Sequence, residues 1–271
     1  MARTKKGRGE TALITGASSG IGEALAGCFA KDGYDLVLVA RSADKLKALA
    51  DKLASSHGAK VRVEPADLST PGSAERLAAA MKRKKVDIDI LVNNAGVLEH
   101  GAFANISAKR HQDLISLNVS GLTAMLAQFL PLMVKRGHGR ILNVASIAAF
   151  QPVPSLATYA ATKAYVLSLT ESLSEELKGT GVSITALCPG ITATNMMSTA
   201  QGASPELAQL PGMLVGNADV VAAEGYEACM KGEVIRVPGI VNLAITLTSR
   251  ASPRWLLRRI SGTLGRKTLR G

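Results

Sequence analysis

A phenol and an ammonium group stand four residues apart in this sequence, at Tyr159 and Lys163, in a stretch with helical character. Residues at i and i+4 are neighbours on one helix face. A nearby cation favours the tyrosinate and lowers the pKa of the phenol from about 10, toward the pH at which it exchanges a proton with a substrate oxygen. The pair predicts acid/base chemistry at a hydroxyl or carbonyl oxygen, with an exposed helix pair as the alternative interpretation.

Two further polar groups directly follow apolar runs that are typical of buried strands. Ser146 follows the run 140–145, and Asn93-Asn94-Ala95-Gly96 closes the run 88–93. Because ligands bind beyond the carboxyl ends of the strands in a parallel sheet, these groups and Tyr159 are expected at one edge. This convergence argues against an accidental spacing of Tyr159 and Lys163.

A glycine-rich turn follows the first apolar run and opens the first predicted helix. It has the sequence Thr15-Gly16-Ala17-Ser18-Ser19-Gly20-Ile21-Gly22. Free backbone N–H groups and the positive end of the helix suit a pyrophosphate, and the glycines permit its close approach. The spacing departs from G-x-G-x-x-G, so the position within a strand–helix–strand unit supports a dinucleotide site more than the glycines do. A plain tight turn is the alternative.

The second predicted strand ends at Ala40 and is followed by Arg41. An NAD site normally carries an acidic residue there for the ribose 2′-hydroxyl. A guanidinium pairs a 2′-phosphate in two-pronged geometry, so NADP(H) is favoured over NAD(H), and the hydroxyls of Ser18 and Ser19 can reach the same phosphate. A solvated arginine is the alternative.

The elements that must position these residues alternate regularly along the chain. Strands are expected at 11–14, 36–40, 60–64, 88–93, 140–145 and 182–187, and helices at 20–30, 43–55, 73–84, 110–135 and 157–178. Continuous apolar strands that alternate with helices predict an α/β fold, a doubly wound parallel sheet with helices on both faces. The length suits a single domain.

Together, these motifs resemble the short-chain dehydrogenase/reductase (SDR) family, of the type called classical, over residues 10 to about 238. The matching residues are the turn 15–22, Asp67, Asn93 to Gly96, Asn118, Ser146, Tyr159, Lys163 and Pro189-Gly190 followed by Thr194. The resemblance implies a Rossmann-type fold and an enzyme that interconverts a carbonyl and an alcohol by hydride transfer with a nicotinamide cofactor. It divides the chain into a basic flexible leader (1–9), a catalytic domain (10–238) and a basic amphipathic extension (239–271).

The resemblance also implies catalytic roles for Asn118, Ser146, Tyr159 and Lys163. Tyr159 would be the general acid for carbonyl reduction and the base for alcohol oxidation. Ser146 would hydrogen-bond the substrate oxygen and stabilise the charge that grows on it. Lys163 would bind the nicotinamide ribose hydroxyls as well as tune Tyr159, and Asn118 would help to hold a water that connects Lys163 to solvent.

For the cofactor, the resemblance implies that Asp67 contacts the adenine ring, that Asn94 and its neighbours line the adenosine side, and that 189–194 holds the carboxamide end of the nicotinamide. The full expected set is Gly16, Ser18, Ser19, Gly20, Ile21, Gly22, Arg41, Asp67, Leu68, Asn94, Ala95, Gly96, Tyr159, Lys163, Pro189, Gly190, Thr192 and Thr194.

The leading hypothesis for function is an NADP(H)-dependent reductase of a hydrophobic ketone or aldehyde. An NAD-linked alcohol or hydroxysteroid dehydrogenase is the alternative among enzymes. A non-catalytic dinucleotide-binding regulator is the remote alternative, because fold alone does not imply activity. The intact set of Asn118, Ser146, Tyr159 and Lys163 argues against the regulator, since a sensor needs no proton-transfer groups.

The formal net charge of +11 lies at the two ends of the chain. Residues 1–10 carry +3, and residues 234–271 contain eight basic and no acidic residues, so the body between them is neutral. A neutral body with 3% aromatic residues argues against nucleic-acid binding. The family resemblance instead implies a homodimer or homotetramer, formed through the helices at 110–135 and 157–178.

Neither a disulfide framework nor a metal site is predicted. The odd number of cysteines, all in apolar runs, suits reduced core thiols, and the histidines lack paired spacing and are expected at surface or loop positions. With no signal-peptide core and no apolar run long enough to span a bilayer, a cytoplasmic location is expected. These residues are Cys28, Cys188, Cys229, His57, His100, His111 and His138.

The C-terminal third holds the expected substrate side. The loop at about 191–232 contains Met196, Met197, Met213 and Leu214, which suit either a flexible apolar lid over a hydrophobic carbonyl or the packing of a mobile helix. After Pro253, an apolar face (Leu256, Ile260, Leu264) lies opposite a basic one (Arg254, Arg258). This pattern predicts a basic amphipathic helix that rests on an anionic membrane surface, packs across the substrate cleft or forms a subunit interface.

Overall fold

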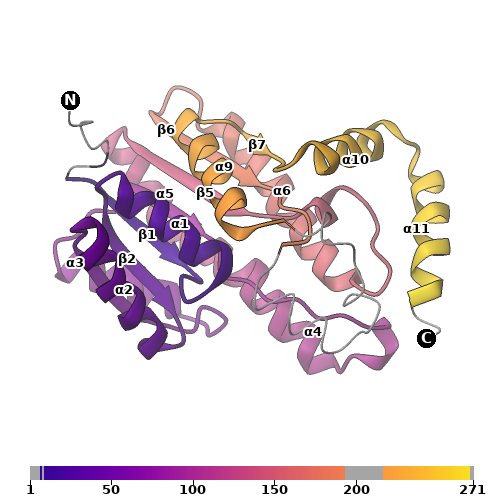
Figure 1. Ribbon diagram of the computed structural model, residues 1–271, viewed down its shortest axis with the longest axis horizontal. Helices are drawn as coiled ribbons and strands as arrows, with labels where there is room; N and C mark the ends of the chain where they lie inside the picture. The colour runs from indigo at the N-terminus through magenta and orange to yellow at the C-terminus, as the bar shows by residue number, and fades with distance from the viewer. Residues whose placement is uncertain (1–6, 8, 193–215, 269–271) are drawn as a thin grey trace.

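The computed structural model describes residues 7, 9–192 and 216–268, with side chains as far as residue 263 (Figure 1). Seven parallel strands form one sheet in the order β3-β2-β1-β4-β5-β6-β7. They are β1 (Thr11–Thr15), β2 (Asp35–Ala40), β3 (Val61–Pro65), β4 (Ile90–Asn93), β5 (Gly139–Val144), β6 (Val182–Leu187) and β7 (Ile235–Arg236). The strand order reverses direction between β1 and β4, and ligands bind at such a switch point.

Helices cover both faces of this sheet (Figure 1). One face carries α1 (Gly20–Lys31), α2 (Ala43–His57) and α9 (Ala218–Lys231), and the other carries α3 (Ser73–Arg83), α5 (Leu122–Arg136) and α6 (Ala157–Glu176). Neighbouring strand residues serve opposite cores: fully buried Leu13 packs with the second helix layer and fully buried Ile14 with the first. Burial on both faces accounts for the continuous apolar strands, and the predicted α/β fold is confirmed.

Six of the strands and all the expected helices lie within a few residues of the predicted bounds. The sequence interpretation missed β7, because two residues are too short for a recognisable pattern. The predicted helix at 110–135 is α4 (Ala108–Ile115), a π-helical turn (Ser116–Gly121) and α5 in direct succession.

This succession of helices, residues 108–136, is long and apolar enough to span a membrane by length and composition alone. The prediction that the sequence contains no such run was therefore wrong on that measure. In the structure, Leu122, Met125, Phe129 and Met133 are buried against the sheet in the core. Core packing therefore accounts for the apolar composition of this helix.

Two helices follow β7. Helix α10 (Ile240–Ala251) leads away from the sheet, and α11 (Arg254–Thr268) runs at a steep angle to it along the outer edge of the molecule (Figure 1). The helix that was predicted after Pro253 is therefore present. The neighbouring apolar run at 240–247 is helical as well.

Candidate active site

The glycine-rich turn joins β1 to α1 and is fastened to the end of β4. Gly16 and Gly20 have positive φ angles of 66° and 59°, which a side chain would disfavour. A Cβ at Gly22 would lie 2.4 Å from both Asn94 Nδ2 and Gly16 O. Ser19, the N-cap of α1, makes no side-chain cap hydrogen bond, so the first N–H groups of the helix can receive an anion. The turn therefore fits a dinucleotide pyrophosphate.

Polar contacts with the residues that follow β4, the strand beside β1 in the sheet, hold this turn in place. Asn94 Nδ2 donates to the carbonyl oxygens of Thr15 (3.0 Å) and Gly16 (3.1 Å). Buried Thr15 Oγ1 accepts from the backbone N–H groups of Asn94 (2.9 Å) and Ala95 (3.0 Å) and donates to Val92 O (3.1 Å). Sequence reasoning placed Thr15 in the turn but missed this role. The amide of Asn94 shapes the turn, and its contact with adenosine stays a prediction.

Arg41 and Asp67 follow the neighbouring strands β2 and β3 at the same edge. Both side chains are exposed. Hydrogen bonds from the Ser69 hydroxyl (2.6 Å) and backbone N–H (3.0 Å) lower the pKa of Asp67, and the charge of Arg41 lowers it further. Since the guanidinium acts on Asp67, the two groups share the surface expected for the adenosine. Leu68, next in the chain, is buried.

Ser146 and Tyr159 lie together at the end of β5. Buried Ser146 Oγ accepts from Ala148 N (3.1 Å) and lies 3.5 Å from Pro189 O. Burial raises the pKa of Tyr159, and a hydrogen bond with the Ser146 side chain lowers it in part. The sequence prediction had Lys163 lower this pKa below its ordinary value, and that direction was wrong. Lys163 Nζ lies 5.7 Å from the ring centroid, and burial lowers its own pKa to about 8.

Lys163 and Asn118 meet beside Gly96, which belongs to the motif after β4. A Cβ at Gly96 would lie 3.2 Å from Asn118 Oδ1 and 3.6 Å from Lys163 Nζ. Buried Lys163 Nζ donates to Val144 O at 2.8 Å. Asn118 lies in the π-helical turn, a local distortion that often marks functional sites, and its amide exchanges hydrogen bonds with the backbone of Val97 at 2.9 and 3.0 Å. The structure thus brings these residues together.

Beneath the site lies a set of buried polar contacts that the sequence interpretation missed. Asn118 Nδ2 also donates to Thr162 Oγ1 (3.2 Å), whose hydroxyl donates to the carbonyl of Tyr159 (2.8 Å). A second chain joins the strands to α6, in which Asn93 donates to Asn143 (3.0 Å) and Asn143 to Thr170 (2.9 Å). In the sequence, the sign of these contacts was that Asn93 and Asn143 are polar residues inside apolar runs.

His111 was also predicted wrongly, because it is buried in α4 rather than at a surface or loop position. Its Nε2 lies 3.2 Å from Phe103 O, and its Nδ1 lies 2.8 Å from the hydroxyl of Thr158, next to Tyr159. Because a carbonyl only accepts, Nε2 carries the proton and Nδ1 accepts from Thr158. His111 therefore fastens α4 to the start of α6.

The segment after β6 completes the described part of the site. Buried Thr192 donates to Gly190 O (3.1 Å) and pairs with Gly216 in an isolated bridge. Thr194 and the residues expected in a lid, Met196, Met197, Met213 and Leu214, lie outside the described residues. Within the described ranges, no group of three or more His, Cys, Asp or Glu side chains is placed to hold a metal ion.

Comparisons with known proteins agree with this geometry. A model of the short chain dehydrogenase family matches residues 10–204. Oxidoreductase UcpA of Salmonella typhimurium is 38% identical over 200 residues, which are 73% of this chain and 75% of that protein. Among solved structures, a 7β-hydroxysteroid dehydrogenase has a TM-score of 0.84 at 25% identity and covers 96% of this chain and 99% of its own.

Two further solved structures are similar. A short-chain dehydrogenase from Sphingobium yanoikuyae in complex with NADPH has a TM-score of 0.80 at 35% identity, with 89% of this chain and 93% of that one covered. An SDR protein from Burkholderia phymatum in complex with NAD has a TM-score of 0.78 at 29% identity, with 89% and 92% covered. The chain belongs to the short-chain dehydrogenase/reductase family and is an oxidoreductase that acts on CH–OH groups with NAD(P).

Proposed function

We propose that this protein reduces a hydrophobic ketone or aldehyde with NADPH. The observation that carries the cofactor preference is Arg41, which follows β2 where an acidic residue would select the ribose 2′-hydroxyl. Its guanidinium is exposed and close enough to Asp67 to lower the pKa of that carboxyl. A 2′-phosphate beside Arg41 would gain a two-pronged, charge-assisted contact. The similar structure from Sphingobium yanoikuyae binds NADPH, which supports this choice.

The residues at the carboxyl edge have the arrangement that carbonyl reduction requires. The nicotinamide supplies the hydride when bound. Tyr159 donates its phenolic proton to the substrate oxygen, and Ser146 donates a hydrogen bond to the same oxygen as negative charge develops there. Burial raises the pKa of this phenol, so Tyr159 holds the proton that it would donate to the substrate oxygen.

Lys163 and Asn118 act behind Tyr159 in this proposal. Lys163 Nζ uses one donor on Val144 O, so two remain for the ribose hydroxyls of the cofactor. Asn118 Oδ1 faces the same space beside Gly96 and accepts one bond from Val97 N, which leaves one lone pair to hold a water. Such a water would connect Lys163 to solvent beside Tyr159, and Lys163 would hold the ribose hydroxyls of the cofactor.

A hydroxysteroid is a second candidate substrate, favoured by one observation. The 7β-hydroxysteroid dehydrogenase covers 96% of this chain, compared with 89% for the Sphingobium yanoikuyae structure. The unmatched 4% of 271 residues is about 11 residues, fewer than the 15 of α11. At least part of α11 therefore has a counterpart in the hydroxysteroid dehydrogenase.

The cofactor proposal is tested by Arg41→Asp, with Arg83→Asp at the end of α3 as the matched control. Oxidation of NADPH and of NADH would be followed with a panel of aliphatic, aromatic and steroid ketones. Wild type and Arg83→Asp should prefer NADPH. Loss of one two-pronged contact with phosphate should cost Arg41→Asp on the order of a hundredfold in kcat/KM for NADPH relative to NADH. An unchanged preference would refute the role of Arg41.

A further inference from the structure

Helix α10 turns polar residues toward the protein and apolar residues toward solvent. A helix on a globular protein normally turns its apolar stripe to the core and its polar residues to water. In α10, Thr246 and Ser249 are 3% and 7% exposed, whereas Ile240, Val241 and Leu247 are 87%, 60% and 58% exposed. Leu243 and Ile245 are exposed as well. The outward surface of this helix therefore suits an apolar environment rather than water.

Specific polar contacts fix this orientation. Ser249 Oγ donates to Gln151 Oε1 (3.0 Å), and Asn242 Nδ2 donates to Pro238 O (2.8 Å). Arg250 pairs with Glu171 at 3.6 Å and stacks over the ring of Phe150. A rotation that buried the apolar face would break these contacts. The exposed apolar surface is thus built into the fold, and such a surface marks a site of interaction.

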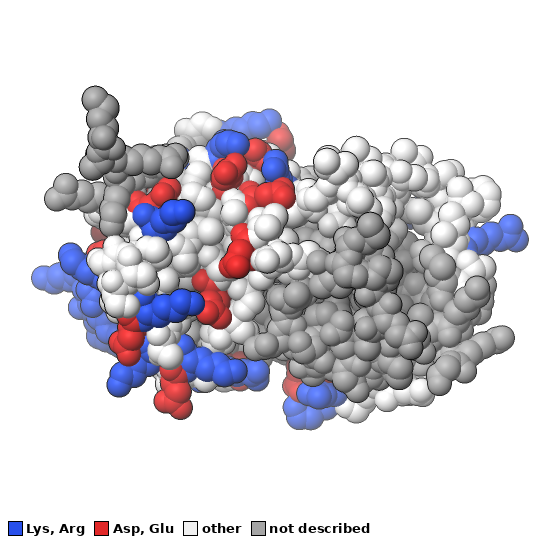
Figure 2. Space-filling view, in the orientation of Figure 1, with Lys and Arg blue, Asp and Glu red and all other residues white. Residues whose placement is uncertain are grey.

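Helix α11 extends this surface and adds positive charge. Trp255 and Ile260 are 56% and 51% exposed, and Arg254, Arg258 and Arg259 are exposed too. From residue 234 to the end, the sequence contains eight basic and no acidic residues. Figure 2 shows the visible face over α10 without charged side chains, with a blue patch at the outer edge beside α11.

We propose that the outward faces of α10 and α11 dock on an anionic lipid bilayer. An apolar helix face flanked by arginine, with tryptophan at the boundary, is what an interfacial helix requires. Anionic headgroups supply the charge that the C-terminal segment itself lacks. A second copy of the chain fits less well, because pairing α11 with itself would bring arginine against arginine without a carboxylate from that segment.

The position of α10 connects this surface to the active site. Gln151, which receives the bond from Ser249, ends the short turn that begins after Ser146. Asn242 lies against Gly190, since a Cβ there would be 2.6 Å from the Asn242 side chain. A bilayer at α10 would therefore lie beside the edge where the substrate reacts, so a carbonyl dissolved in lipid could enter directly. The docking itself does not depend on the proposed reductase activity.

The chain carries its own probe for this proposal, because Trp255 is its one tryptophan. The full-length protein would be mixed with vesicles of phosphatidylcholine alone, or with about one third phosphatidylglycerol, at an ionic strength of about 0.1 M. We expect co-sedimentation with the anionic vesicles and a blue shift of tryptophan emission that fades as salt is raised. Unchanged emission and no sedimentation with anionic vesicles would overturn the proposal.

Paired variants separate the apolar and basic contributions. Val241→Asp/Leu247→Asp and Arg254→Glu/Arg258→Glu/Arg259→Glu should each weaken binding to anionic vesicles by on the order of a hundredfold. The controls are Val220→Asp/Val234→Asp and Lys47→Glu/Lys82→Glu/Arg83→Glu, which make equivalent changes at exposed positions elsewhere. These controls should bind as wild type does, and equal weakening in them would overturn the proposed site.

Light scattering after size exclusion tests a second copy as the occupant. We expect Val241→Asp/Leu247→Asp to keep the oligomeric state of the wild type. A smaller oligomer in this variant, together with blue-shifted wild-type emission in the absence of vesicles, would assign the face to a subunit interface and overturn the proposal. Because sedimentation and emission need no turnover, they can succeed even if no carbonyl is reduced.

Discussion

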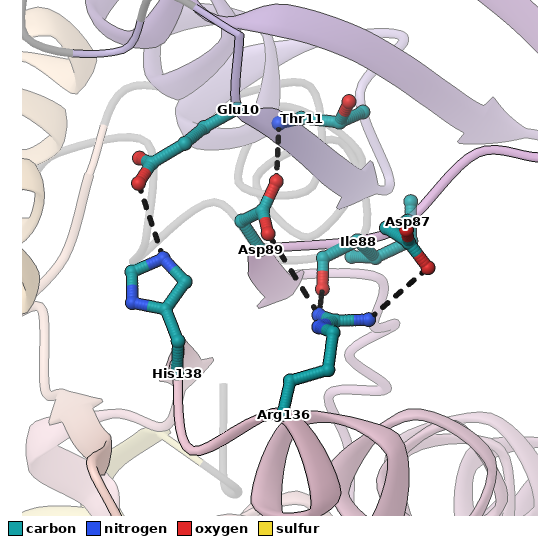
Figure 3. Close-up of polar contacts among 7 residues, drawn as sticks. All are labelled: Glu10, Thr11, Asp87, Ile88, Asp89, Arg136 and His138. Atoms are coloured by element: carbon teal, nitrogen blue, oxygen red, sulfur yellow. Dashed lines mark hydrogen bonds and ion pairs between the residues drawn. The ribbon is translucent and has the colours of Figure 1, made fainter.

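Polar side chains at the two edges of the sheet differ in their burial and in their interaction partners. At the carboxyl edge, Ser146, Asn118 and Lys163 are buried, and Lys163 has a backbone carbonyl as its hydrogen-bond acceptor. At the amino edge, charged side chains are partly exposed and paired with one another (Figure 3). Lys163 keeps two donors free, and burial shifts the pKa values of Tyr159 and Lys163, so the carboxyl edge is suited to chemistry.

At the amino edge, side-chain contacts connect the starts of β1 and β4 to the end of α5 (Figure 3). Asp89 Oδ2 accepts from Thr11 N (2.8 Å), and Arg136 Nη2 donates to Ile88 O (2.5 Å). Arg136 also pairs with Asp87 at 3.3 Å and with Asp89 at 3.8 Å. Each charge there has an opposite charge and solvent nearby, so this edge contributes stability rather than reactivity.

The largest effect should come from Tyr159→Phe, which removes the proton donor from the carboxyl edge and leaves the packing of the ring. A positioned general acid contributes roughly 10²- to 10⁴-fold, so kcat should fall by about a thousandfold or more. The measurement is the steady-state rate with NADPH and the best ketone of the panel. Cofactor affinity and thermal unfolding should change little.

The matched control for that variant is Tyr165→Phe on the same helix. Tyr165 is 38% exposed and its hydroxyl lies 2.9 Å from Thr123 Oγ1, away from the reacting centre. It should turn over as fast as wild type. Full activity in Tyr159→Phe would show that Tyr159 is not the proton donor. It would contradict the assignment of the chemistry to this residue at the carboxyl edge.

Lys163→Met should change how stability depends on pH. Burial lowers the pKa of Lys163 from 10.5 to about 8, so between these values the unfolded chain binds more protons than the folded protein. The free energy of unfolding of wild type should therefore rise with pH relative to Lys163→Met over this window, by on the order of 1 to 3 kcal/mol. Urea unfolding near pH 7 and pH 10 measures the difference.

Lys178→Met, just beyond the end of the same helix at an exposed position, is the control for this experiment. Its pH profile should run parallel to that of wild type. If the profile of Lys163→Met were parallel as well, burial would not lower the pKa of Lys163 in the folded protein.

The fold was accessible from sequence because its strands are buried on both faces. Leu13 and Ile14 serve opposite cores, so the strand appears as one apolar run, and helix starts with glycine or polar residues separate the runs. The same reasoning located Ser146 and Asn94 at strand ends. It did not reveal what their side chains bind, since Asn94 turns back to Thr15 and Gly16, almost 80 residues away.

Contacts between distant segments were the part that could not be predicted. His111 and Thr158 are 47 residues apart, so no local pattern shows that the histidine is buried. The orientation of α10 is a second example, because an apolar helix would be expected to turn inward. The face of α10 that turns toward the protein is determined by Ser249 and Arg250. They contact Gln151 and Glu171. Periodicity describes one element, whereas these outcomes depend on which element lies opposite.

A smaller effect is expected from Arg136→Ala at the amino edge. The variant loses the charged donor to Ile88 O and two ion pairs, but the side chain is 30% exposed and solvent replaces part of this. The free energy of unfolding should fall by about 1 to 2 kcal/mol, while kcat/KM stays within about twofold of wild type. Chemical denaturation and steady-state rates measure both, with exposed Lys135→Ala as the control. A large loss of kcat at unchanged stability would contradict the division between the edges.

The smallest effect should come from His138→Ala. His138 Nε2 lies 3.1 Å from Glu10 Oε1, and the two side chains are 48% and 33% exposed. Pairs this open to water contribute little, so the free energy of unfolding should change by less than about 0.5 kcal/mol and activity should not change. The comparison with Arg136→Ala is informative because both residues pair with carboxylates at this edge, but only Arg136 also bonds a backbone carbonyl. If His138→Ala cost as much as Arg136→Ala, the stability of this edge would come from charge pairing alone rather than from fastening the backbone of β4.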